Sequence, residues 1–190
     1  MKSGHASDRK ASGSAPAPRA RARFSIDTRA WLLGGGVAIA VNTGLLFIAA
    51  HLGLQTGHGG LLKLLRPWIT PVLEHTGLTQ AWASMHLPST GSTGFKVGFH
   101  VFVGMLMAAF YALVERYVPW RPWLKGLAYA AAVYLANALI VLPLLGQGVA
   151  GYRAASATGL VYFALVHTVF FLLLAWGYDR VCRQRAAQAN

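Results

Sequence analysis

The sequence predicts an all-α protein: a four-helix transmembrane bundle with an external interfacial helix between helices one and two. Three observations predict this fold. Four stretches, 30–62, 97–114, 126–152 and 154–178, contain no Asp, Glu, Lys or Arg. Hydrophobic residues make up 55% of the 190 residues, and charged residues only 12%. The cations are also unevenly divided between the two ends of the predicted spans, as multispan membrane proteins require.

A bilayer core of about 30 Å needs about 20 apolar residues of helix. We therefore expect spans near 30–52, 96–116, 122–145 and 157–178, which together form one membrane domain over 30–180. Glycine and alanine recur at four-residue spacing, for example Gly36, Ala40 and Gly44 in helix one. Because small residues let helix backbones approach closely in lipid, these stripes predict the packing faces of the bundle.

The distribution of cations predicts the orientation. One end of the spans receives 13 of the 17 lysines and arginines, and the other end receives only Lys63, Arg66, Lys96 and Arg153. Short loops rich in Lys and Arg mark the cytoplasmic side. Both termini should therefore be cytoplasmic and the loop 53–94 external.

The first 29 residues form a basic segment rich in Ser, Ala, Pro and Arg, which we expect to be disordered and to contact anionic lipids of the cytoplasmic leaflet. Residues 181–190 form the cytoplasmic tail. The net charge of +12 indicates topology and lipid contact, so no nucleic-acid partner is predicted. The single cysteine, Cys182, excludes an intramolecular disulfide.

The external loop 53–94 divides into two parts. Apolar positions at helical spacing over 61–73 predict an interfacial helix that is interrupted at Pro67 and Pro71, while 84–94 is rich in Ser, Thr, Pro and Gly and reads as loop. A loop of this length is often a binding surface, so a protein partner is a candidate occupant. Its histidines, His58, His75 and His86, match no metal-ligand spacing, and no metal site is predicted.

Polar residues within the spans are the candidate functional residues, because they are costly in lipid and face the bundle interior. We expect Asn42, His100, Asn137 and His167 to form a polar cluster in the outer half of the membrane. Three interpretations stay open: hydrogen bonds that specify helix packing, handling of protons or a small ligand by the histidines, and ligation of haem b by His100 with His167, or quinone binding.

Charged residues flank the cytoplasmic ends of helices two and four. Glu115 lies beside Arg116, and Asp179 beside Arg180, so we expect ion pairs at this rim. No arrangement of residues is typical of a catalytic or nucleotide-binding site. The prediction is therefore a membrane protein without enzymatic activity and without a cofactor.

The C-terminal half resembles the YagU-like family of small bacterial inner-membrane proteins. The landmarks that carry the resemblance are His100 at the start of its span, Glu115, Pro119, Trp123 and Gly126 around the cytoplasmic link, the Pro-Leu-Leu-Gly sequence at 143–146, and His167 in the last span. The resemblance implies an inner-membrane location and a part in acid tolerance. The overall expectation is an accessory or stress-related component, with small proton or solute transport as the alternative.

Overall fold

The computed structural model describes residues 27–54, 56, 60–85, 89, 91–153 and 155–188. These residues form helices and turns without a strand, which confirms the predicted all-α class. Four helical segments are long and apolar enough to cross a membrane: Thr28–His51 (α1), Thr93–Tyr117 (α4 with a 3₁₀ turn), Pro122–Leu144 (α5, a π-helical turn and α6) and Ala157–Gln188 (α7). By length and composition, the chain is a multipass membrane protein.

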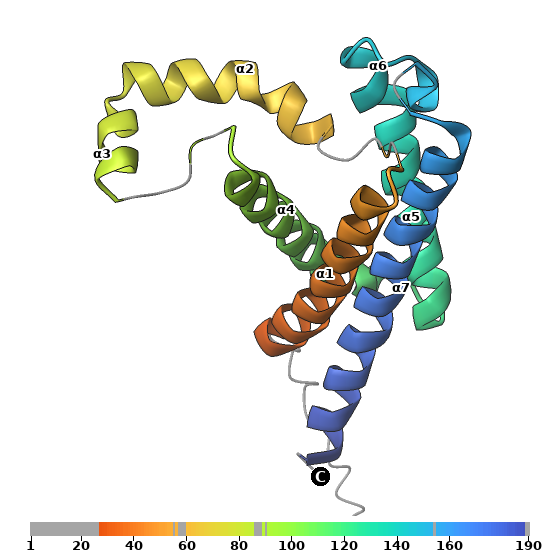
Figure 1. Ribbon diagram of the computed structural model, residues 1–190. Coiled ribbons are helices and arrows are strands. Elements are labelled where there is room, and N and C mark those ends of the chain that lie inside the picture. Colours follow the sequence, from red (N-terminus) through yellow and green to blue (C-terminus); the bar gives the residue numbers. More distant parts are fainter. Residues whose placement is uncertain are drawn as a thin grey trace, which may run out of the picture.

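The first and last spans form the centre of the bundle. α1 (Thr28–His51) packs along α7 (Ala157–Gln188), α4 (Thr93–Val114) packs on α1, and α5 (Pro122–Ala136) packs on α7. α1 begins and α7 ends at the same end of the molecule, as Figure 1 shows. The predicted tail 181–190 continues α7 as helix to Gln188. Of the segment 1–29, which was predicted to be disordered, residues 1–26 lie outside the described residues.

Close backbone contact between α1 and α7 rests on two glycines. A Cβ built on Gly34 would lie 2.9 Å from the backbone nitrogen of Tyr178, and one built on Gly177 would lie 3.1 Å from the Cα of Gly34. Gly34 shares a buried stripe at four-residue spacing with Ala30, Ala38 and Asn42. Small residues therefore bring these backbones together, as membrane helix packing requires.

The small residues expected to form the packing face of helix one, Gly36, Ala40 and Gly44, do not pack against the neighbouring helices. Ala40 and Gly44 are exposed, and a Cβ on Gly36 or Gly44 would meet nothing within 4 Å. The contact stripe lies two residues earlier in register, at 30, 34 and 38. Several small residues follow one another here, so spacing alone selects more than one face, and only the neighbouring helices decide between them.

α4 contacts α1 closely in the half near the chain termini. Gly104 lies directly against the Ile39 side chain, and Gly35 lies against Ala108. Around these contacts, Phe171, Leu174 and Tyr178 of α7 are almost completely buried. Gly98, nearer the other end of α4, has open space where a Cβ would lie. The bundle is therefore tightly packed in one half and looser in the other.

The loop between α1 and α4 contains two helices, α2 (Gly60–His75) and α3 (Leu78–Ser84). α2 lies across the ends of the spans (Figure 1) and was expected; α3 was not predicted, and it ends at Ser84, where the segment 84–94 expected to be loop begins. The predicted interruption at Pro67 and Pro71 is wrong, because α2 continues through both prolines. Their four-residue spacing places both missing N–H donors on one face of the helix, which limits the disruption to that face.

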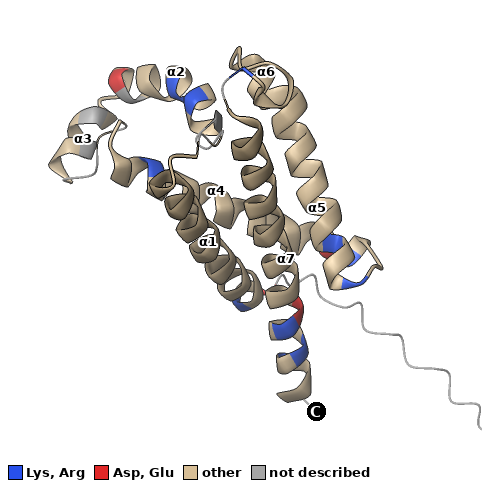
Figure 2. Ribbon diagram, turned by 45° about the vertical axis from the view of Figure 1, so that its right-hand side comes forward, with Lys and Arg blue, Asp and Glu red and all other residues tan. Residues whose placement is uncertain are grey.

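The charged residues follow the helix ends. Figure 2 shows Lys and Arg near both ends of the helices. By their positions in the helices, the described cations at the end where α1 begins are Arg29, Arg116, Arg121, Lys125, Arg180, Arg183 and Arg185, and those at the opposite end are Lys63, Arg66, Lys96 and Arg153. Asp27 caps α1 by accepting a hydrogen bond from Ala30 N–H, and it also accepts one from Arg185 Nη1 at 2.8 Å. Although burial by itself raises the pKa of Asp27, these hydrogen bonds lower it overall.

Substitution of Gly34 tests the α1–α7 contact. We expect Gly34→Ala to lower the free energy of unfolding by about 1–3 kcal/mol, because the added methyl group meets fixed backbone. Gly36→Ala is the matched control, since its Cβ enters open space. Thermal unfolding of both variants in the same detergent measures the difference. Equal stability of the two variants would contradict the packing described here.

Candidate functional site

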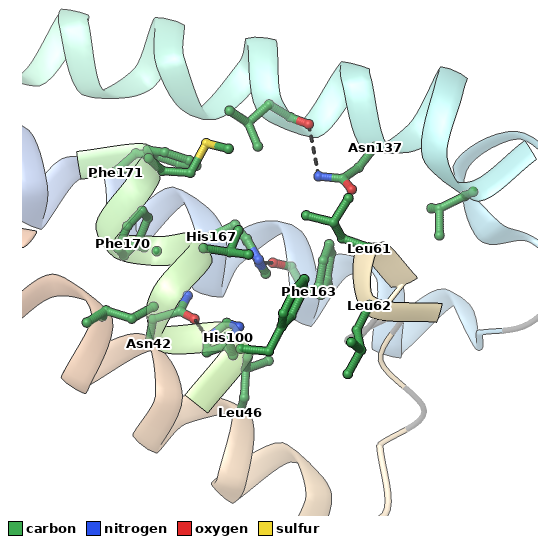
Figure 3. Close-up of a pocket in the computed structure, with 17 residues that line it drawn as sticks. Asn42, Leu46, Leu61, Leu62, His100, Asn137, Phe163, His167, Phe170 and Phe171 are labelled. Atoms are coloured by element: carbon green, nitrogen blue, oxygen red, sulfur yellow. Dashed lines mark hydrogen bonds between the residues drawn. The ribbon is translucent and has the colours of Figure 1, made fainter. Parts of the chain in front are cut away.

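A cavity of about 140 Å³ lies between the four spans, in the loosely packed half of the bundle. We call it the central cavity (Figure 3). Its lining includes all four predicted polar residues, Asn42, His100, Asn137 and His167. Leu61 and Leu62 of α2 also line it, so α2 covers part of the cavity. The structure therefore places the four residues around one space.

Asn42 is the residue that joins three spans. Its side chain is 1% exposed, and its Nδ2 donates a hydrogen bond of 3.1 Å to the carbonyl oxygen of Val166 in α7. Its Oδ1 lies 2.9 Å from Nε2 of His100 in α4. Because Oδ1 can only accept, Nε2 of His100 carries the hydrogen of this bond. One amide thus links α1 to α4 and to α7.

His167 lies deeper in the cavity and bonds within its own helix. Its Nδ1 is 2.9 Å from the carbonyl oxygen of Phe163, so Nδ1 donates to that oxygen. Its ring lies 3.9 Å, centroid to centroid, from the ring of Phe163. In the neutral forms defined by these bonds, His100 holds its acceptor lone pair on Nδ1 and His167 holds its own on Nε2.

Asn137 belongs to a π-helical turn, Asn137–Val141. It lines the cavity, but its Nδ2 donates to Val133 O of its own helix at 3.1 Å and not to the Asn42–His100 pair. Pro143 follows this turn and lacks the N–H that a regular helix would donate to Leu139 O. The widened turn accommodates that missing donor, and it accounts for the π geometry without a bound ligand.

Two tyrosines contribute contacts that the sequence did not predict. Tyr129 of α5 donates to Met107 O of α4 at 3.1 Å, and Tyr162 of α7 donates to Leu45 O of α1 at 2.8 Å. The hydroxyl of Tyr162 therefore links α7 to α1. No spacing in the sequence signals Tyr129, because its role depends on how α5 meets α4.

Ion pairs form at the end of the bundle where α1 begins and α7 ends, but the partners differ from those expected. Glu115 pairs with Lys125 at 2.7 Å across the link between α4 and α5, and Asp179 pairs with Arg183 one helical turn later at 2.8 Å. Arg116 and Arg180 lie over aromatic rings, those of Tyr117 and Trp176. Adjacent residues on a helix point in different directions, whereas positions four apart share a face.

The central cavity is small for haem b. Its volume of about 140 Å³ lies below the roughly 300–1,000 Å³ typical of sites for drug-sized ligands. In the described part of the chain, no group of three His, Cys, Asp or Glu side chains is placed to hold a metal ion. His58 and His86 lie outside the described residues.

Comparison of the chain with known protein families, with curated proteins and with solved structures found no match in any of the three.

Substitution of Asn42 tests the link between the spans. We expect Asn42→Leu to lower stability by about 1–2 kcal/mol, because His100 and the α7 carbonyl both lose a partner. Asn137→Leu is the matched control, since Asn137 bonds only within its own helix. Thermal unfolding in detergent compares the two. A larger loss for Asn137→Leu would overturn the assignment of Asn42 as the linking residue.

Proposed function

We propose that the chain is a non-enzymatic, multispan protein of the bacterial inner membrane, an accessory component that acts in acid tolerance through His100. The observation that carries this proposal is the hydrogen bond between His100 and Asn42, at the point where α1, α4 and α7 meet. The resemblance of the C-terminal half to the YagU-like family supports the link to acid tolerance. A protein partner on the external loop 53–94 belongs to the same proposal.

Protonation of His100 adds a positive charge to a space already lined by cations. Histidine is the side chain that proteins most often use to respond to mild acidification, because it gains a positive charge on protonation. The ring of His100 is faced by Asn42 of α1, and it lines a space that also contains Lys63 and Arg66 of α2 and Lys96 of α4. His167 of α7 shares the central cavity. A charge on His100 therefore repels α2, and we propose that α2 moves away from the spans in acid.

The orientation is part of the proposal. The excess of Lys and Arg at the end where α1 begins supports cytoplasmic termini and an external α2. Reporter fusions at Asn190 and near Ser89 test it: the first should report a cytoplasmic position and the second an external one. The opposite result would place His100 near the cytoplasm and remove its connection to external acidity.

Transport is less well supported. The terminal half of the bundle is filled by Phe170, Phe171 and Leu174, which are almost completely buried. The four charge-free stretches also contain no carboxylate that could relay a proton across the membrane. The central cavity therefore has a closed inner end, which suits a site that responds to external conditions better than a conduction path.

Replacing His100 by Gln keeps a hydrogen-bonding side chain but removes the titration. We expect the stability of the wild-type protein to change more between pH 7.5 and 5 than that of His100→Gln, because Gln carries no group that titrates in this range. We also expect poorer acid survival of cells carrying the variant. His75→Gln is the control, because His75 is exposed at the same end. Identical pH profiles for wild type and His100→Gln would refute the proposal.

A further inference from the structure

A second, larger space lies beside the central cavity. It has a volume of about 570 Å³ and is enclosed by α1, α2 and α4 at the end of the spans opposite the chain termini. We call it the cationic groove. It exists because α1 and α4 are in contact at Gly35 and Gly104 and diverge towards α2, which crosses above the gap, as Figure 1 shows. His100 and Leu62 line both spaces.

Three cations line the groove: Lys63 and Arg66 of α2 and Lys96 of α4. No carboxylate lines it among the described residues, and within that part of the chain none of the three cations forms an ion pair. A Cβ built on Gly91 would lie 3.7 Å from Nη2 of Arg66, so this guanidinium reaches the start of α4. The amino-terminal turn of α4 adds positive potential at the same place. The groove therefore attracts an anion.

Apolar side chains form a second part of the wall, beside Thr43, Thr56, Thr93 and His100. Leu46, Phe47 and Ala50 of α1 face Val97 of α4 and Leu62 of α2. Phe47 is 46% exposed, although it lies near the end of a span. A small hydrophilic anion would leave this wall uncovered, whereas a molecule with a charged head and an aliphatic chain would cover both parts of the groove.

We propose that the cationic groove binds an anionic phospholipid from the leaflet at the α2 end. The phosphate lies between Lys63, Arg66 and Lys96, and an acyl chain follows Leu46, Phe47 and Val97. α2 lies across the span ends, at the level of the lipid headgroups. Three cations without a lining carboxylate favour a headgroup with net negative charge over a zwitterionic one. The site does not depend on the titration of His100 or on the side of the membrane that α2 faces.

The test uses the full chain purified in a neutral detergent. Phosphatidylglycerol and phosphatidylcholine with identical acyl chains are added in turn, and bound lipid is measured by native mass spectrometry together with the shift in unfolding temperature. We expect phosphatidylglycerol to bind and stabilise the protein more than phosphatidylcholine does. Inorganic phosphate and glycerophosphoglycerol, which lack acyl chains, should give little stabilisation. Equal effects of the two lipids, or full stabilisation by a chain-free anion, would overturn the proposal.

Substitution of the groove cations tests whether the lipid binds in the groove. Each of Lys63→Gln, Arg66→Gln and Lys96→Gln should weaken phosphatidylglycerol binding about fivefold, which corresponds to about 1 kcal/mol per cation. The triple variant should lower the preference over phosphatidylcholine further than any single variant does. The matched control is the triple variant Arg121→Gln, Arg153→Gln and Arg180→Gln, which removes three cations outside the groove. If the control loses as much binding, or the single groove variants lose none, the lipid binds elsewhere and the proposal fails. The single variants keep the test decisive if the groove triple variant does not fold.

Discussion

The contact between α1 and α7 determines most of what surrounds it. Gly34 and Gly177 allow the two backbones to meet, and this contact aligns the buried stripe of α1 along α7. Asn42 lies two helical turns after Gly34 in that stripe, so it arrives opposite the carbonyl oxygen of Val166. In lipid, an amide in this position needs a partner, because no water is present to satisfy it. The glycine contact thus positions the polar link.

The two halves of the bundle differ in packing, and the difference has a local cause. Gly104 and Ala108 let α4 come close to α1 near the termini, whereas the wider part of the α1–α4 pair is bridged by His100 and Asn42. Beyond this bridge the helices separate, and α2 covers the opening with Leu62. The central cavity and the cationic groove therefore arise from one crossing. They meet at His100, which lines both.

The sequence anticipated the spans well because lipid imposes strict rules on composition. A charge-free stretch of sufficient length has few alternatives to a transmembrane helix, and the four predicted spans correspond to α1, α4, α5 with its π turn and α6, and α7. The gathering of Asn42, His100, Asn137 and His167 around one cavity follows from the same cost, because polar groups turn away from lipid. The spans and the grouping of their polar residues could therefore be predicted from the sequence alone.

The tertiary structure determined which face of each helix packs against its neighbours and which side chains form pairs. The spacing of small residues in helix one allowed two faces, and only contact with Tyr178 and Gly177 selects the one containing Gly34. Glu115 finds Lys125 because the link between α4 and α5 folds back, which sequence proximity to Arg116 did not reveal. The length and apolarity of each span were fixed by the chemistry of the bilayer, which acts on each helix separately. Faces, partners and cavities depend on how helices cross, and that is a property of the assembled bundle.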